Sequence, residues 1–277
     1  MIDTTGYRKM ELKELQSLVL QTMMDIHQFC EKNKIDYYII AGTVLGAIRH
    51  NGFVPWDDDI DIAMTRDNYD KFKSLFGKDK IMNCYFLQDY LTDKDFGLAL
   101  MRVCIPNTLL DWPAQNHLRN CKNAYIDIFP LDVVPTNARQ QARQANMIKQ
   151  LNLLCNLKLY RVSNKSNIVN YTLKTVMHGL LFFVPIKWLV KLKLRIMRKY
   201  ENENSPYLCS MQSHYSYSKQ KMLKTIYGKP TLIPFEDTFF YGPEKTDEYL
   251  SQLYGDYMRL PPVEKRPKPL DTYIKEK

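Results

Sequence analysis

Residues 41–64 read AGTVLGAIRHNGFVPWDDDIDIAM, and this stretch decides the fold prediction. A short run rich in β-formers, residues 36–41, leads into a Gly-Thr pair, after which residues 44–49 predict a helix. That helix is expected to end at Asn51-Gly52, and a Pro-Trp pair then introduces four aspartates within five positions. Strand, glycine turn, short helix and acidic strand therefore follow one another directly.

The aspartates are the strongest sign of chemistry in the chain. Alternate residues of a strand share a face, so we expect Asp57, Asp59 and Asp61 on one side and Ile60 and Ile62, buried, on the other. Three carboxylates within about 7 Å of one another along a strand repel strongly unless a cation lies among them. Hard oxygen ligands suit Mg²⁺ or Mn²⁺. The alternative is a solvated acidic turn; the buried isoleucines favour the metal site.

The Gly42-Thr43 pair and the end of the short helix predict a second element of the site. A glycine at a strand-to-helix junction lets backbone N–H groups approach a phosphate, and a threonine hydroxyl adds a hydrogen bond. A plain helix cap is the common alternative. Arg49 and His50 close the same helix just before the acidic strand. Amide donors, a guanidinium and a metal ion within one unit point to phosphoryl-group transfer.

The rest of the chain predicts an α+β fold, a mixed sheet with flanking helices and a mostly helical basic segment. Apolar spacing predicts helices over 11–33, 66–76 and 138–160, and strands over 85–88, 96–104 and 124–129, the last closed by Pro130. We divide the chain into a catalytic core (1–135), a basic helical segment (136–200) and a part (201–277) that completes the catalytic domain and ends in an extended polar tail.

Composition excludes several classes of protein and localises the charge. With 10 Gly and 6 Cys in 277 residues, collagen-like and disulfide-scaffold proteins are excluded, and the cysteines have no zinc-ligand spacing. Their use indicates a reducing cytoplasm, and no secretory signal pattern opens the chain. The net charge is +9, yet residues 133–200 hold 13 Lys or Arg and no acid, which leaves 26 basic and 30 acidic residues elsewhere. The basic character belongs to one segment.

The basic segment contains an amphipathic helix. Beyond Pro185, apolar and basic side chains fall on opposite sides of a helical wheel, except that Lys193 lies on the apolar side. The uncharged run 175–186 is too short to span a membrane. We predict that residues 175–199 dock on an anionic membrane surface, with Phe182, Phe183 and Trp188 inserting. The alternative is a helix packed on the protein with its charges solvated.

The run 41–64, with Tyr125-Ile-Asp-Ile-Phe-Pro-Leu-Asp132 and Tyr254-Gly-Asp-Tyr-Met-Arg-Leu-Pro-Pro262, resembles the LicD/fukutin family of phosphotransferases. That family is similar in fold to the nucleotidyltransferase superfamily, in which a Gly-Ser or Gly-Thr turn and an Asp-x-Asp strand face a nucleotide–metal complex. The resemblance covers about 20–132 and 230–262 and leaves the acid-free middle unmatched.

The resemblance implies a role for each residue of the site. Gly42 and Thr43 would form the phosphate turn, Asp59 and Asp61 would bind the metal, and Asp127, on a neighbouring strand, would be the third carboxylate. Asp57 is the extra acid typical of the LicD type, which binds a second metal or tunes the first. Arg49 resembles a basic residue near the diphosphate.

Three further residues lie within or near family-like motifs. Arg102, on the strand predicted over 96–104, is a weaker candidate for the diphosphate, and a salt bridge on the sheet surface is the equal alternative. Asp132 and Asp256 are expected to have structural roles, as turn and cap residues.

The resemblance also implies a reaction. Its donor is a CDP conjugate, most often CDP-choline, and its product a phosphodiester on a sugar hydroxyl, with CMP leaving. Mg²⁺ or Mn²⁺ on Asp59 and Asp61 would bridge the diphosphate, and Asp127 or Asp57 would activate the acceptor hydroxyl. We expect a cell-surface glycan or glycolipid precursor (lipopolysaccharide, teichoic acid or capsule) as acceptor, reached in the cytoplasm by peripheral contact with the inner face of the plasma membrane.

Several alternatives remain at this stage. Phosphoethanolamine, glycerol phosphate or ribitol phosphate could replace phosphocholine as the transferred group. The runner-up function is a nucleotidyltransferase that uses a nucleoside triphosphate on a small acceptor, because fold similarity alone does not decide chemistry. A non-catalytic membrane adaptor is a third. Nucleic acid is not expected as a partner, because the basic block lacks interleaved surface aromatics and any familiar reader motif.

Overall fold

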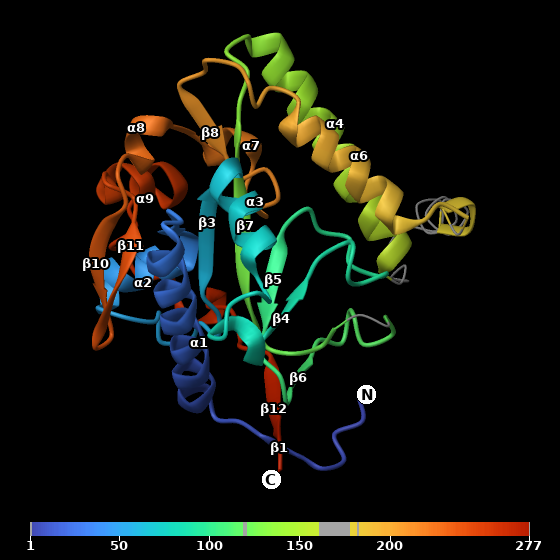
Figure 1. The fold of residues 1–277 in the computed structure, drawn as a ribbon, viewed down its shortest axis with the longest axis vertical. Helices are drawn as coiled ribbons and strands as arrows, with labels where there is room; N and C mark the ends of the chain where they lie inside the picture. The colour runs from blue at the N-terminus through green and yellow to red at the C-terminus, as the bar shows by residue number, and fades with distance from the viewer. Residues whose placement is uncertain (1, 119–120, 161–177, 182, 277) are drawn as a thin grey trace.

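The computed structural model describes residues 2–118, 121–160, 178–181 and 183–276. Its centre is a mixed sheet in the order β2-β3-β7-β5-β4, extended beside β7 by β8 and β9 (Figure 1). The strands are β2 (Tyr38–Ile39), β3 (Asp61–Thr65), β4 (Phe86–Gln88), β5 (Met101–Cys104), β7 (Tyr125–Val133), β8 (Tyr207–Cys209) and β9 (Lys221–Leu223). Among the described strands of this sheet, β3 and β7 pair in parallel and the other pairs are antiparallel. The predicted α+β class is confirmed.

The predicted N-terminal helices are present, and they pack on this sheet. They are α1 (Leu12–Asn33), α2 (Ala41–His50) and α3 (Arg66–Leu75). α1 buries Leu15, Val19, Met23, Ile26 and Cys30, which is the stripe expected from the spacing of apolar residues. Their side chains join Ile62 and Ile128 of the sheet in one hydrophobic core.

Strand β7 runs through Pro130 to Val133, so the prediction that this proline ends the strand is wrong. Proline has no N–H to give to a neighbouring strand. Beside β7, the pairing with β5 ends at Ile128 and the pairing with β8 begins at Asp132. On that side of Pro130 no paired strand needs a hydrogen bond from a backbone N–H, so the strand can contain a proline there.

The last part of the chain also differs from the predicted extended tail. It ends in β12 (Asp271–Lys275), which lies between β1 (Tyr7–Lys9) and β6 (Thr108–Asp111) in a separate antiparallel sheet. Before it come the hairpin β10 (Thr231–Phe235) and β11 (Thr238–Gly242) and the helix α9 (Thr246–Tyr254). Short helices α7 (Tyr217–Gln220) and α8 (Lys224–Tyr227) flank β9. Both termini lie together at the bottom of Figure 1.

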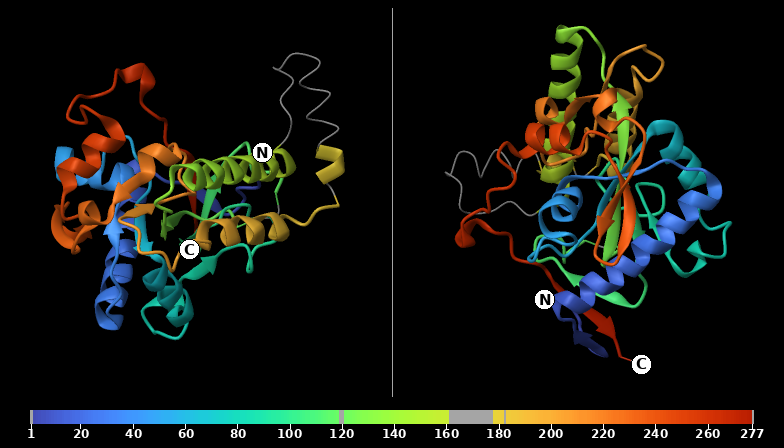
Figure 2. Two further views of the ribbon diagram at one scale, coloured as in Figure 1. Left: turned by 90° about the horizontal axis from the view of Figure 1, so that it is seen from above. Right: turned by 90° about the vertical axis from the view of Figure 1, so that its left-hand side faces the viewer.

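Within its described residues, the acid-free segment includes two antiparallel helices, α4 (Ala138–Leu159) and α6 (Ile186–Arg198), which project from the end of β7 (Figures 1 and 2). Ile186, Leu189 and Val190 of α6 are buried against α4 and the sheet in a second core cluster. The apolar stripe of α6 is thus core, as the alternative reading held. Trp188, at its margin, remains 72% exposed.

Lys193, the exception on the apolar face of α6, is buried (1% exposed). Its Nζ donates to the carbonyl oxygen of Gly97 at 3.0 Å, to Asn152 Oδ1 at 2.8 Å and to Gln212 Oε1 at 3.0 Å. Burial lowers its pKa. The ammonium group with all three protons satisfied holds α6 to α4 and to the segment before β5.

No helix within the described residues is long and apolar enough to cross a bilayer. Of the segment predicted to dock on a membrane, residues 175–177 and Phe182 lie outside the described residues.

Candidate active site

Asp61 and Asp127 form the centre of the site. Asp61 opens β3 and lies beside Asp127 of β7 in parallel register. Neighbouring strands are about 4.8 Å apart and paired residues point to the same face, so the two carboxylates are neighbours. Ile62 and Ile128, the next pair, are fully buried on the other face. The alternation expected at these strands is present.

Residues 57–60 lie next to the site but do not join the sheet. The prediction of a strand from Asp57 is therefore wrong for these four residues, and β3 begins at Asp61. The neighbouring strand is too short to pair with them: β2 pairs with Ile62 and Ala63, and the chain then turns into α2. The charge of Asp57 nevertheless raises the pKa of Asp59, and the charges of Asp59 and Asp57 raise the pKa of Asp61, so the acids form one cluster.

Gly42 brings the first turn of α2 against Asp57. A Cβ at Gly42 would lie 2.8 Å from Asp57 Oδ2, too close for any other residue to be accommodated without movement. The turn is reached through Ala41, which has a φ of 50°, unusual for alanine, and whose N–H donates to the Tyr249 hydroxyl at 3.2 Å. A negative charge is favourable at this end of a helix. The predicted phosphate turn thus lies within the helix, beside a carboxylate.

Thr43 supports the same cluster. Its hydroxyl accepts a hydrogen bond from the backbone N–H of Asp61 at 2.8 Å, and its side chain is buried. This contact fixes the start of β3 against α2. In the structure, the hydrogen bond of Thr43 positions Asp61. A contact between Thr43 and a phosphate stays a prediction.

Arg102 is part of the site as the partner of Asp127. Its Nε donates to Asp127 Oδ1 at 2.7 Å, and its guanidinium lies 3.7 Å from the centre of the Tyr125 ring. The two residues are paired across β5 and β7. The side chain of Arg102 is only 5% exposed, so the ion pair that we held as the alternative exists, but in the interior and not on the sheet surface.

Arg49 lies at the far end of α2 and is held by the last part of the chain. Its Nη1 donates to the carbonyl oxygen of Tyr257 at 2.7 Å, and its Nε to His50 Nε2 at 3.0 Å. Its charge still lowers the pKa of Asp57. The residue is thus close to the acids, and its contact with a diphosphate stays a prediction.

The remaining acids of the motifs have structural contacts. Asp58 accepts a hydrogen bond from the Leu270 N–H at 2.9 Å, which holds its carboxylate to the last part of the chain. Asp132 is buried within β7 and receives two hydrogen bonds from Arg66, at 2.8 and 2.7 Å, so it is structural but not a turn residue. Asp256 is exposed, in a turn where its carbonyl oxygen accepts from the Arg259 N–H.

The cluster holds more negative charge than the protein neutralises. Although the Asp59 side chain is exposed, surrounding protein atoms remove part of its hydration, and with the charges of Asp57 and Asp58 this raises its pKa to about 7. Burial, with the charge of Asp58, raises the pKa of Asp57 to about 6. Burial and then Asp59 raise the pKa of Asp61 well above its usual range. Only the Arg102 charge opposes this rise at Asp59 and Asp61.

These shifts predict that the metal-free protein becomes less stable as the pH rises. A carboxyl whose folded pKa lies above its unfolded value binds more protons in the folded state, so its contribution to the free energy of unfolding falls between about pH 4 and pH 7. Urea unfolding at pH 5 and pH 8 measures the effect. Asp59→Asn should have a smaller loss of stability over this range than the wild type; an equal loss would show that the cluster does not titrate in this way.

The cluster fits a divalent cation. Within the described residues, no hydrogen-bond donor or ion-pair partner contacts the carboxylate of Asp59 or Asp61, and no three His, Cys, Asp or Glu side chains form a ready-made metal cage. Mg²⁺ is commonly held by one or two carboxylates together with substrate phosphates and water. Two unpartnered carboxylates beside Asp127 satisfy that requirement without a full set of protein ligands.

Aromatic residues around the acids were not singled out from the sequence. Tyr215 and Tyr254 pack edge to face with ring centres 5.7 Å apart, and the charge of Asp61 raises the pKa of both. Burial is the larger cause in each case. They come from segments over 150 residues beyond the acidic stretch. Nothing in their local sequence marks them, because only the folded chain brings them to the cluster.

Residues 34–150 match the family model described as LicD/FKTN/FKRP, nucleotidyltransferase domain. A lipopolysaccharide cholinephosphotransferase LicD from Haemophilus influenzae is 29% identical over 93% of this chain and 95% of its own length. The chain is thus similar to the LicD family, through its nucleotidyltransferase domain and over most of its length. The match to the Haemophilus protein extends through the acid-free segment, which the motifs alone left unassigned.

Two shorter matches concern part of the family domain. An uncharacterized protein of Rickettsia typhi is 42% identical over 69 residues, a quarter of this chain and 22% of that protein. An uncharacterized protein of Rickettsia prowazekii is 48% identical over 48 residues, 17% of this chain and 18% of that protein. These matches are local, and they carry no statement about activity.

Proposed function

We propose that this protein is a metal-dependent phosphotransferase that moves phosphocholine from CDP-choline to a hydroxyl of a lipopolysaccharide precursor at the cytoplasmic face of the membrane. The observation that carries the proposal is the pairing of Asp61 with Asp127, beside Asp59, with more charge than Arg102 neutralises. The full-length similarity to the Haemophilus cholinephosphotransferase supports the choice of phosphocholine and of lipopolysaccharide.

Different residues of the cluster would bind different parts of the donor. Asp59 and Asp61 would hold Mg²⁺ or Mn²⁺, with Asp127 as the third carboxylate, and the bound cation would neutralise the diphosphate. Gly42 and Thr43 place the first turn of α2 next to the cluster, where its N–H groups favour an anion. Arg49 would add a positive charge on the side of Asp57. Catalysis of this kind is mostly positioning and charge neutralisation.

Geometry favours Asp57 over Asp127 as general base for the acceptor hydroxyl. Asp127 receives a hydrogen bond from Arg102 at 2.7 Å, which holds its carboxylate and its negative charge. Within the described residues no side-chain donor contacts the Asp57 carboxylate, which lies at the start of α2. A base must be free to take a proton. We assign that role to Asp57 and the orientation of the site to the Arg102–Asp127 pair.

A groove of about 850 Å³, lined by both polar and apolar side chains, provides room for a glycan. It lies between α4 and residues 210–218, and Asn146, Asn152 and Ser213 line it together with Tyr217. Tyr215 also lines this groove and is close enough to Asp57 and Asp61 to be affected by their charge. Amide, hydroxyl and aromatic groups together suit a carbohydrate, and the groove therefore leads an acceptor toward the acids.

The Tyr215–Tyr254 pair is the candidate partner of the choline ammonium. Tyr125 already faces Arg102, whereas the charge of no Lys or Arg among the described residues lies over Tyr215 or Tyr254. A cation on an aromatic face is worth up to about 2 kcal/mol when desolvated. We predict that Tyr254→Leu raises the KM for CDP-choline by about tenfold or more and that Tyr254→Phe does not. Equal KM values for the two variants would contradict this assignment.

The experiment that tests the function is a panel of CDP-choline, CDP-ethanolamine, CDP-glycerol, CDP-ribitol and CTP, each with rough lipopolysaccharide and Mg²⁺. We expect acceptor-dependent release of CMP from CDP-choline above all. Pyrophosphate release from CTP would instead indicate a nucleotidyltransferase. CMP release from another conjugate would keep the reaction type and change the transferred group.

A further inference from the structure

A second site of concentrated charge lies away from the acidic cluster, in a hollow of about 560 Å³ between α3 and α6. Six basic side chains line it, against two acidic ones, Asp70 and Asp89. The basic residues are Arg66, Lys73, Lys191, Arg195, Arg198 and Lys199. Such an excess of positive charge favours an anionic ligand.

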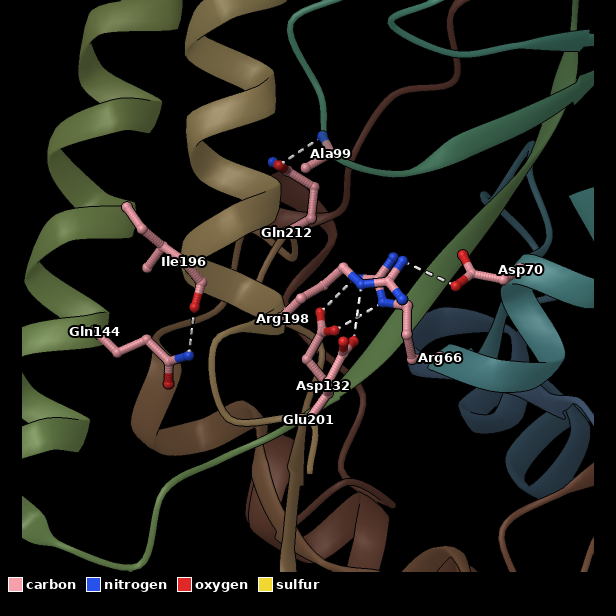
Figure 3. Close-up of polar contacts among 9 residues, drawn as sticks. All are labelled: Arg66, Asp70, Ala99, Asp132, Gln144, Ile196, Arg198, Glu201 and Gln212. Atoms are coloured by element: carbon pink, nitrogen blue, oxygen red, sulfur yellow. Dashed lines mark hydrogen bonds and ion pairs between the residues drawn. The ribbon is translucent and has the colours of Figure 1, made fainter. Parts of the chain in front are cut away.

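Half of these cations are already paired. Arg66 is held by Asp132, Lys73 by Asp89, and Arg198 bridges Asp70 and Glu201 at 2.8 Å to each, as Figure 3 shows for the two arginines. Protein carboxylates therefore already neutralise these three cations. Lys191, Arg195 and Lys199 are exposed and make no ion pair with the described residues. Three uncompensated charges therefore face the hollow, a set suited to phosphate oxygens.

An apolar hollow of about 440 Å³ adjoins the basic one. Val184, Trp188 and Leu192 line it, together with Lys191 and Arg195, which also line the basic hollow. Trp188 is 72% exposed and Leu192 45%, and Phe183, just before α6, is 85% exposed. A phosphate-binding hollow and an apolar hollow that share two basic residues match the two parts of a lipid, an anionic headgroup and its acyl chains.

We propose that this surface of α6 binds a bilayer that contains anionic phospholipid, with lipid phosphate between α3 and α6 and with Trp188 and Leu192 inserted beside the acyl chains. The buried stripe of α6 packs on α4, so the helix presents this surface without unfolding. Asp132, the partner of Arg66, lies five residues beyond Asp127 on β7, about 16 Å along the strand. The surface is independent of the proposed reaction and would hold the acidic cluster near a membrane.

The test is co-sedimentation of the full chain with vesicles of phosphatidylcholine, with and without phosphatidylglycerol. We expect binding to the anionic vesicles only, weakened by salt. Each basic residue near an anionic surface contributes about fivefold to binding, so Lys191→Gln with Arg195→Gln should weaken partitioning by about thirtyfold. Trp188→Ser should weaken it through lost insertion. All three side chains are exposed, so the fold should be unaffected.

A matched control removes the same charge elsewhere. Lys13→Gln with Lys78→Gln changes two exposed lysines that make no ion pair with the described residues and lie outside both hollows. This control should bind anionic vesicles nearly as the wild type does. Equal loss in the control and in the α6 variant would overturn the proposal, because net charge alone would then explain the binding.

Other outcomes also overturn it. No binding to anionic vesicles, or equal binding to neutral ones, would remove the headgroup site. Stabilisation by inorganic phosphate through Lys191 and Arg195 without vesicle binding would assign the hollow to a soluble phosphate. Binding of RNA as strong as that of vesicles and unaffected by Trp188→Ser would indicate a general polyanion surface.

Discussion

Asp61→Asn is expected to abolish phosphocholine transfer while making the metal-free protein more stable. Neutralising a diphosphate through a bound cation is worth several kcal/mol of transition-state stabilisation, so the rate should fall by about a hundred- to a thousandfold. The free energy of unfolding should rise, because one of several mutually repelling carboxylates is removed. Initial rates with CDP-choline and urea unfolding without metal measure the two effects.

Asp58→Asn is the matched control for that prediction. Asp58 lies in the same acidic run, but its carboxylate accepts a hydrogen bond from Leu270, and an asparagine oxygen can accept the same bond. Transfer should stay within a few fold of the wild-type rate. If Asp61→Asn remained active, or if Asp58→Asn lost as much activity, the assignment of the metal-binding face would be wrong.

Arg102→Met is expected to cost about 3–5 kcal/mol of stability, the range for removing one partner of a buried ion pair. Its guanidinium is 5% exposed, is bonded to Asp127 and contacts the Tyr125 ring. Without the Arg102 guanidinium, Asp127 would lie among other carboxylates with no buried cation beside it. Asp127→Asn in the Arg102→Met background should restore part of the stability, and unfolding of both variants in urea measures the coupling.

Arg8→Met provides the comparison on the surface. Arg8 pairs with Glu14, but both side chains are well exposed. Exposed pairs contribute little to stability, because water and salt screen their attraction, so this change should leave the free energy of unfolding almost unchanged. A similar small loss for Arg102→Met would mean that the interior pair does not orient the site as described.

Local patterns in the sequence predict much of the fold. Apolar spacing gave α1, α3 and α4 to within a residue or two, and the alternation of aspartate with isoleucine gave β3, although its start was predicted at Asp57 and lies at Asp61. Predictions failed where the neighbouring strands determine where a strand begins, ends or pairs. The run from Asp57 stays outside the sheet because β2 is too short to pair with it. Strand β7 continues through Pro130 because the side opposite β3 has no paired strand at that residue. The last strand pairs with residues far away in sequence.

The candidate site was predictable where its residues are adjacent in sequence. Gly42, Thr43 and the aspartates follow one another within twenty residues, and the alternation of isoleucine with aspartate predicted that Asp127 shares the face of Asp61. The role of Arg102 depends on a register between β5 and β7 that no local pattern contains. Tyr215 and Tyr254 reach the acids through the packing of the last third of the chain, so the sequence alone offered no way to choose them.

The most direct test of the central claim is the mass of the acceptor after incubation with CDP-choline and Mg²⁺, measured for the wild type and for Asp61→Asn. The account predicts that lipopolysaccharide gains one phosphocholine with the wild type, with one CMP formed for each, and gains nothing with the variant. An acceptor that gains a cytidylyl group, or one that gains phosphocholine equally with Asp61→Asn, would contradict it.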